Sequence, residues 1–84
     1  METYTVYILY SESFDKYYIG QTSNADQRLL LHNAGYVLST KPYVPWRTVC
    51  ELKKETRSEA MILEKKLKNL NRQRLVLFID KYSK

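Results

Sequence analysis

The chain has 84 residues, enough for one small hydrophobic core, and we expect a single domain over residues 1–84. Apolar residues make up 44% and charged residues 27%, with only two glycines and two prolines, which excludes collagen-like, low-complexity and strongly disordered chains. Lysine and arginine outnumber aspartate and glutamate by 14 to 9. The resulting net charge of +5 favours partners that carry phosphate groups.

The expected compartment follows from cysteine usage and from the lack of a targeting pattern. Cys50 is the single cysteine, so no disulfide can form within the chain. The sequence has no signal-peptide pattern and no apolar run of about 18 residues. We therefore expect a soluble cytoplasmic protein without membrane contact, and the sequence leaves the oligomeric state open.

The N-terminal part of the chain predicts a β-hairpin. Residues Tyr4–Tyr10 are rich in aromatic and β-branched side chains, which favour strands. The polar stretch Ser11–Lys16 suits a loop, and Tyr17–Thr22 predicts the second strand.

A helix, a loop and a third strand are predicted next. Ser23–Asp26 offers side-chain oxygens that cap a helix, and this helix should end at His32 or Asn33. Gly35 suits the stop that follows a helix. The segment Gly35–Pro45 predicts a loop, and Trp46–Leu52 predicts the third strand.

Two further helices complete the predicted fold. Thr56 and Glu59 have capping-box spacing. The apolar residues that follow recur at helical spacing and form one stripe: Ala60, Leu63, Leu67 and Leu70. Residues Leu75–Tyr82 predict a short last helix, with a strand as the alternative. The order β-β-α-β-α-α predicts an α+β fold, a small three-stranded antiparallel sheet flanked by helices.

The two hairpin strands carry a pair of tyrosines and a glycine. Side chains alternate along a strand, so Tyr7 and Tyr18 can lie on the same face. Gly20 shares the face of Tyr18 and would leave the backbone open, so that a substrate could approach it closely. The alternative is that both tyrosines are amphipathic residues at the edge of the core.

Arg28 and His32 form a second candidate pair. They are four residues apart on a predicted helix and so project from one face, while the residues Leu29–Leu31 would pack. Arginine is a fixed cation whose donors match phosphate oxygens, and histidine can donate to a phosphate or orient a water molecule. The alternative is a solvated helix face with an ordinary surface histidine.

Glu64 borders the apolar stripe of the later helix. Mg²⁺ often takes only one or two carboxylates and keeps water molecules and substrate phosphates as its other ligands, so Glu64 is a candidate metal ligand. The alternative is a surface ion pair with Lys68, four residues further on.

A set of basic residues could hold a nucleic-acid backbone, with the aromatic residues Tyr36, Tyr43 and Trp46 nearby. Its members are Lys41, Arg47, Lys53, Lys54, Arg57, Lys65, Lys66, Lys68, Arg72 and Arg74. Among them we expect Lys41 to contact substrate. The alternative is that these charges serve only solubility.

Together these residues resemble the GIY-YIG endonuclease family over nearly the whole chain, from Tyr4 to about Leu70. Thr5-Val6-Tyr7 is similar to the first family signature, with threonine in place of its glycine, and Tyr18-Ile19-Gly20 is similar to the second. The remaining family positions are matched by Arg28, His32 and Glu64. The chain is most similar to small stand-alone bacterial members, which resemble the N-terminal incision domain of the DNA-repair excinuclease subunit UvrC.

The resemblance implies an endonuclease that hydrolyses a DNA phosphodiester with one Mg²⁺ or Mn²⁺ ion. Tyr7 would be the general base, and Tyr18 would orient the attacking water or the phosphate. Arg28 would stabilise charge on the phosphate, and His32 would assist Arg28 or Tyr7. Glu64 would hold the metal ion. A protein partner could supply specificity.

A phenol has an ordinary pKa of about 10, so to act as a base at neutral pH it must have a depressed pKa or act in concert with another group. Positive charge on Arg28 and on the metal ion would lower the pKa of Tyr7. We therefore expect a depressed pKa at Tyr7.

Two other functions fit the same sequence. A nucleic-acid-binding module of the same fold would bind DNA in a salt-dependent manner without efficient turnover. A protein-interaction domain would use the tyrosine-rich face as an interface and would not bind DNA.

Overall fold

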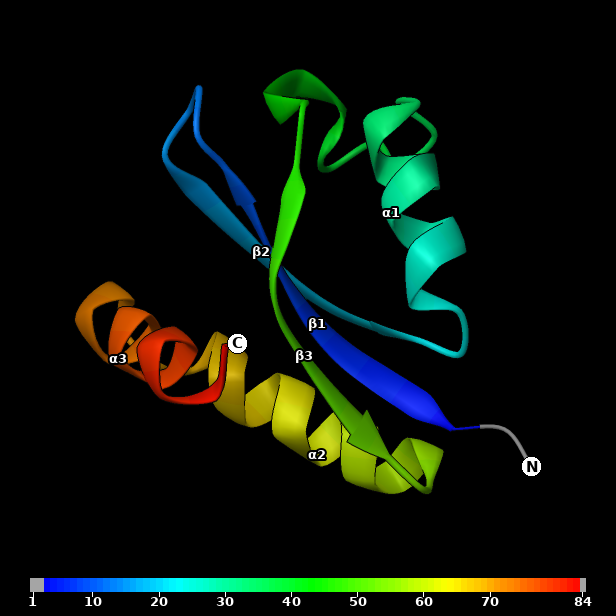
Figure 1. Cartoon of the computed structure of the whole chain (residues 1–84), viewed down its shortest axis with the longest axis vertical. Coiled ribbons are helices and arrows are strands. Elements are labelled where there is room, and N and C mark those ends of the chain that lie inside the picture. Colours follow the sequence, from blue (N-terminus) through cyan, green and yellow to red (C-terminus); the bar gives the residue numbers. More distant parts are fainter. Residues whose placement is uncertain (1–2, 84) are drawn as a thin grey trace.

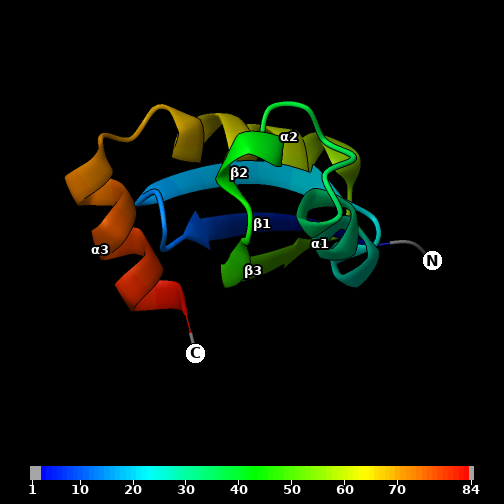
Figure 2. The same ribbon diagram turned by 90° about the horizontal axis from the view of Figure 1, so that it is seen from above.

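The structure is a computed structural model that describes residues 3–83. Three antiparallel strands form one sheet in the order β2-β1-β3 (Figure 2). The elements follow one another as β1 (Tyr4–Ser11), β2 (Lys16–Thr22), α1 (Ala25–Asn33), the 3-10 helix η1 (Lys41–Tyr43), β3 (Arg47–Lys54), α2 (Arg57–Lys68) and α3 (Arg72–Tyr82). The predicted α+β fold and the predicted order of strands and α-helices are confirmed.

Strand β1 lies in the centre of the sheet and is its most buried strand. The pairing with β2 places Tyr7 opposite Gly20 and Leu9 opposite Tyr18. Because side chains alternate along a strand, these four residues share one face of the sheet. The candidate tyrosines therefore lie side by side, as their spacing predicted.

Helices cover both faces of the sheet (Figure 1). Helices α2 and α3 cover one face, where the larger core cluster consists of Val6, Ile8, Ile19, Cys50, Ala60, Leu67, Leu75 and Ile79. Helix α1 and the segment that leads to β3 cover the other face. The smaller core cluster on that side consists of Tyr7, Leu9 and Trp46, with Tyr18, Leu29, Tyr43 and Val44 packed against it. The candidate tyrosines belong to this smaller cluster.

The helix ends follow the capping signals in the sequence. Asn24 caps α1 by accepting a hydrogen bond from the backbone of Gln27, and Gly35 follows this helix with a φ of +83°. A positive φ is the conformation in which glycine replaces other residues after a helix. The side chain of Thr56 caps α2 at the backbone N–H of Glu59. Between residues 3 and 83, no helix has the length and apolar content needed to cross a membrane.

The structure departs from the predictions at the last helix and in the loop before β3. Helix α3 begins at Arg72, three residues before the predicted start, because the side chain of Asn71 caps it. The alternative of a strand at Leu75–Tyr82 was wrong. The predicted loop contains a short 3-10 helix, η1.

Helix α1 packs differently from the prediction. Leu30 is 70% exposed, whereas His32 is fully buried and is the one buried residue of this helix. Of the three leucines that were expected to pack, Leu29 does contact the smaller core cluster, whereas the expectation is wrong for the exposed Leu30. The side of α1 that faces the sheet therefore carries the imidazole of His32. A buried polar group is costly unless it is hydrogen-bonded, so this ring needs partners inside the protein.

Candidate active site

Tyr7 lies in the middle of the central strand and packs directly over Gly20. Tyr7 is only 3% exposed. A methyl group on Gly20 would lie 2.5 Å from Oη of Tyr7 and 2.7 Å from its Cζ, closer than side-chain carbons approach other atoms. Gly20 therefore makes room for the tyrosine ring. This corrects the prediction that Gly20 leaves the backbone open for substrate, because Tyr7 fills that space.

Tyr18 completes an aromatic group around Tyr7. Its ring centroid lies 6.3 Å from that of Tyr7 and 4.9 Å from that of His32. Trp46 closes the group at 6.3 Å from Tyr18. The rings pack at the edge of the core, as the alternative interpretation held, and the Tyr7 hydroxyl also lies against a titratable partner. A catalytic role of the two tyrosines stays a prediction.

His32 is that partner, and it is hydrogen-bonded at both ring nitrogens. Its Nε2 lies 3.0 Å from Oη of Tyr7. Its Nδ1 lies 2.8 Å from Oγ1 of Thr40. The alternative of a solvated surface histidine is wrong, because the side chain is enclosed between α1, β1 and the segment before η1.

The segment that carries Thr40 is fixed to its surroundings. Thr40 is 1% exposed, and its carbonyl accepts a hydrogen bond of 3.0 Å from the indole nitrogen of Trp46. The side chain of Asn33, at the end of α1, accepts from the backbone N–H of Trp46 at 2.6 Å and donates to its carbonyl at 2.9 Å. These contacts hold α1, η1 and the start of β3 together around His32.

Arg28 lies on the same helix as His32 and beside Tyr7. Its guanidinium group is close enough to the Tyr7 hydroxyl to lower the pKa of that phenol. Its Nε is buried and has no hydrogen-bond partner among the described residues. Arginine side chains bind phosphate through such donors, so this nitrogen is available to an anion.

Glu64 approaches from α2, which lies in the other helical layer, next to the edge strand β2. Its Oε1 accepts a hydrogen bond of 3.2 Å from Nε2 of Gln21. Its Oε2 lies 2.9 Å from Nζ of Lys68, so the ion pair considered as the alternative does form. The charge of Glu64 makes the smallest contribution to the raised pKa of Tyr7. No hydrogen bond joins Glu64 to Tyr7, Arg28 or His32 among the described residues.

The pKa of Tyr7 is raised, not depressed. Burial of the phenol has the largest effect, because it disfavours the charged phenolate and outweighs the opposing effect of Arg28. The expectation of a depressed pKa is therefore wrong for the protein alone. Burial, with a smaller contribution from Arg28, lowers the pKa of His32, so that its ring is neutral at neutral pH.

Lys41 occupies the first position of η1 and is exposed. The methylene groups of its side chain lie over Gly35, at 3.6–3.8 Å from where a methyl group on that glycine would be. No hydrogen bond or ion pair joins Lys41 to the other candidate residues among residues 3–83. Its expected contact with substrate stays a prediction.

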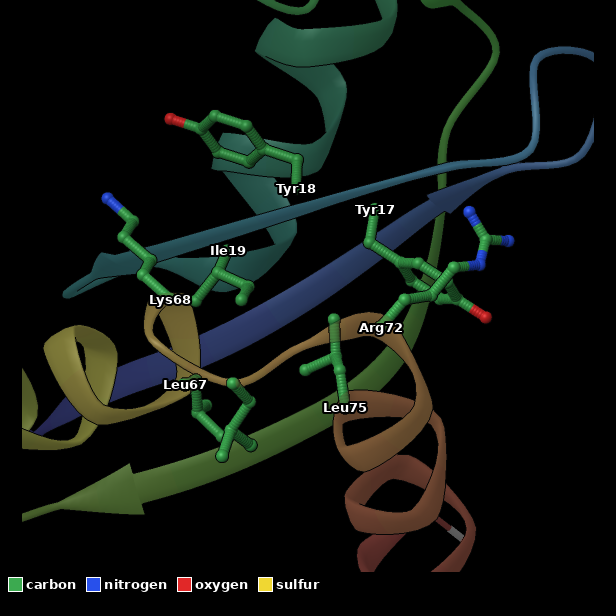
Figure 3. A pocket seen from close by; sticks show the side chains of 8 residues that line it. Tyr17, Tyr18, Ile19, Leu67, Lys68, Arg72 and Leu75 are labelled. Carbon is green, nitrogen blue, oxygen red and sulfur yellow. The ribbon is translucent and has the colours of Figure 1, made fainter.

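A hollow with aliphatic, aromatic and cationic walls lies between β2, α2 and α3, and Tyr18 is the one candidate catalytic residue that lines it (Figure 3). Tyr18 and Lys68 stand on its rim, while Ile19 points from the strand toward Leu67. The remaining lining residues are Tyr17, Leu70, Arg72 and Leu75. Tyr18 thus belongs both to the aromatic group around Tyr7 and to this open surface.

Residues 3–76 match the family of the GIY-YIG catalytic domain. The chain belongs to the GIY-YIG family. The match covers all three strands, α1, α2 and the first half of α3, so every candidate site residue lies inside it. Membership supports an endonuclease function with DNA as the substrate.

A solved structure supports the same fold for this GIY-YIG domain. The solution structure of the UPF0213 protein BH0048 from Bacillus halodurans is similar to it, with a TM-score of 0.61 and 28% sequence identity. The similarity covers 93% of this chain and 83% of the other. No curated protein matches the chain.

Sequence reasoning missed three residues of the GIY-YIG site. Thr40 and Asn33 hold His32 and its surroundings, and Gln21 holds Glu64. Thr40 lies in a predicted loop, where no periodicity indicates which side chains turn inward. Gln21 follows Gly20 directly, and strand alternation places it on the opposite face, toward α2. That alternation was the signal that could have paired it with a helix residue.

Proposed function

We propose that this GIY-YIG domain is a metal-dependent DNA endonuclease that hydrolyses a phosphodiester bond with Tyr7 as the general base. One observation carries the proposal: the hydroxyl of the buried Tyr7 lies 3.0 Å from Nε2 of a neutral histidine, His32, and Arg28 is near enough to lower the pKa of the phenol. A phenol alone would keep its proton at neutral pH, and the neutral imidazole of His32 offers the acceptor that it needs.

In the proposed reaction, the phenol oxygen of Tyr7 takes a proton from the attacking water as its own proton passes to Nε2 of His32. The water oxygen forms the new bond to phosphorus, and the bond from phosphorus to the leaving oxygen breaks. Arg28 stabilises the negative charge that builds up on the phosphate oxygens. Tyr18, at the rim of the site, orients the water or the phosphate. The leaving oxygen takes its proton from solvent.

The carboxylate of Glu64 could serve as one ligand of a hard divalent cation such as Mg²⁺ or Mn²⁺. In the structure Nε2 of Gln21 donates a hydrogen bond to this carboxylate, so the Gln21 amide would have to turn before its oxygen could reach the ion. In the structure Lys68 forms an ion pair with the carboxylate of Glu64, and its ammonium group would have to move away before a metal ion could bind there. Among residues 3–83 no group of three acidic, histidine or cysteine side chains gathers, so water and phosphate would complete the coordination. A bound ion would supply charge stabilisation for the phosphate and the leaving oxygen.

The test is the cleavage of supercoiled, branched and single-stranded DNA with Mg²⁺ or Mn²⁺. We expect nicking by the wild-type chain and a loss of about 100-fold or more in Glu64→Gln and in Tyr7→Phe. Tyr7→Phe keeps the ring over Gly20, so circular dichroism should show an unchanged fold. Wild-type protein that cleaves none of these DNA forms at any metal concentration would contradict the proposal.

The second candidate is a nucleic-acid-binding module without efficient turnover. The observation that favours it is that Glu64 has two partners, an ion pair with Lys68 and a hydrogen bond from Gln21. These contacts stabilise the carboxylate without a metal ion. This candidate predicts salt-dependent DNA binding that is equal in the wild type and in Glu64→Gln, with no cleavage by either. A partner protein that supplies specificity is compatible with both candidates.

A further inference from the structure

The interaction between His32 and Thr40 determines which way the proton of Tyr7 points. A neutral imidazole carries one N–H, so one ring nitrogen donates and the other accepts. Two arrangements fit the distances: His32 donates to Tyr7, or Tyr7 donates to His32. Only the second lets the phenol pass its proton to the ring.

The contacts of Thr40 favour the second arrangement. Its Oγ1 lies 2.8 Å from Nδ1 of His32 and 3.2 Å from the carbonyl oxygen of Val37. A carbonyl oxygen can only accept, so in this contact the Thr40 hydroxyl donates to the oxygen of Val37, which also accepts from the backbone N–H groups of Thr40 and Lys41. The oxygen of Thr40 is then left to accept, and Nδ1 of His32 must carry the ring proton.

The contacts of Tyr7 lead to the same arrangement independently. Among the described residues its hydroxyl makes a hydrogen bond with the ring of His32, and the guanidinium group of Arg28 is near enough to lower its pKa. Arginine has donors only, so it cannot accept the phenol proton. Nε2 of His32 is the remaining acceptor. If His32 donated instead, the proton of Tyr7 would be buried without a partner, at a free-energy cost.

We infer that Thr40 is a positioning residue, which holds His32 as the Nδ1–H tautomer and thereby makes Tyr7 the donor to Nε2. In this arrangement Tyr7 donates to Nε2 of His32, Nδ1 of His32 donates to Thr40, and Thr40 donates to the carbonyl of Val37. After proton transfer the imidazolium still donates through Nδ1 to Thr40, so this end of the chain does not rearrange. The catalytic part of this inference rests on the proposed function, whereas the tautomer itself does not.

The tautomer can be measured directly, because His32 is the only histidine in the chain. Long-range proton–nitrogen correlation spectra of the nitrogen-15-labelled full chain distinguish the protonated ring nitrogen from the unprotonated one. At neutral pH we expect Nδ1 of His32 to be protonated and Nε2 to be unprotonated. A spectrum with the proton on Nε2, or with an even mixture, would overturn the inference whatever the nuclease assay shows.

Three variants test the role of Thr40. Thr40→Val removes the hydroxyl at nearly constant volume and should abolish the preference for Nδ1–H, whereas Thr40→Ser should keep it. Ser39→Ala, at the exposed neighbour, is the matched control. In the cleavage assay we expect a rate at least about tenfold lower for Thr40→Val and a rate rescued by Thr40→Ser. An unchanged tautomer in Thr40→Val contradicts the inference, and if that variant does not fold, the wild-type and Thr40→Ser spectra still decide it. A correct tautomer in a chain that never cleaves DNA would refute the proposed function alone.

Discussion

At the scale of single residues, the site depends on a glycine that lets a tyrosine lie flat on a neighbouring strand. A methyl group on Gly20 would overlap the hydroxyl and the ring of Tyr7. Both residues are buried between strands and α1, so the ring has little room to move aside. The second family signature therefore has a packing reason, separate from any contact with substrate.

We expect Gly20→Ala to lower the free energy of unfolding by about 1–3 kcal/mol, the usual cost of overpacking. It should also displace the Tyr7 hydroxyl from His32 and reduce cleavage. Urea denaturation measures the first effect. A double-mutant cycle supplies the control: in a Tyr7→Leu background the added methyl group should cost clearly less, because the clashing ring is gone. Equal costs in both backgrounds would contradict the packing explanation.

The buried histidine makes stability depend on pH. Burial and Arg28 lower the pKa of His32 in the folded state below its ordinary value near 6.5. The unfolded chain therefore binds a proton more readily than the folded chain. The contribution of neutral His32 is fully present above pH 6.5 and is lost as the pH falls below it toward the folded pKa.

We therefore expect the free energy of unfolding to fall between about pH 7 and pH 5, a range above that in which most carboxylates titrate. Urea denaturation at a series of pH values measures it. His32→Gln is the control, because the variant should show a much flatter dependence over this range. Stability that rises on acidification of the wild type would contradict the assigned burial of a neutral ring.

At the scale of elements, the segment between α1 and β3 is held as firmly as the strands. The side chain of Asn33 makes two hydrogen bonds to the backbone of Trp46, and the indole of Trp46 bonds to the backbone of Thr40. Helix α1 is thus joined to the start of the third strand by polar contacts, in addition to the packing of Leu29 against the cluster that contains Trp46.

We expect Asn33→Ala to lower the free energy of unfolding by about 2 kcal/mol, from two lost hydrogen bonds and the backbone groups left without partners. The loss should also loosen Thr40 and so broaden the His32 signals in the nitrogen-15 spectrum. Asn69→Ala, which changes an exposed asparagine at the end of α2, is the matched control and should stay within about 0.5 kcal/mol of wild type. Equal losses in both variants would contradict the special role of Asn33.

Periodicity and capping signals predicted the elements because both are local properties of the sequence. The capping residues Asn24 and Thr56 and the stripe on α2 lie where the sequence indicated. The burial of His32 could not be predicted in this way. Its partners, Tyr7 and Thr40, are 25 and 8 residues away, and no local spacing relates them. The direction of the Tyr7 pKa shift was missed for a related reason, since burial depends on how α1 closes over the sheet.

At the scale of the whole molecule, charge and layering divide the chain into two sides. Tyr7 lies under α1, which carries Arg28 and His32, whereas α2 and α3 in the other layer carry many of the lysines and arginines. Glu64 lies in that other layer, where it accepts a hydrogen bond from Gln21 of the edge strand β2. A net charge of +5 attracts DNA from any direction, so the charge alone does not indicate where DNA binds.

The salt dependence of binding can locate the DNA. The Glu64→Gln chain, which should not cleave, allows the binding of a short duplex to be titrated at several salt concentrations. If about four phosphates are contacted, the logarithm of the binding constant falls with the logarithm of salt with a slope of about −3.6, and affinity drops by about 150-fold between 50 and 200 mM salt. Arg28→Gln in this background should reduce the slope by about 0.9, the value for one phosphate contact. Lys81→Gln, on α3 in the opposite layer, should leave the slope unchanged. If both changes reduce the slope equally, DNA is held by diffuse charge and not by Arg28 at the site around Tyr7.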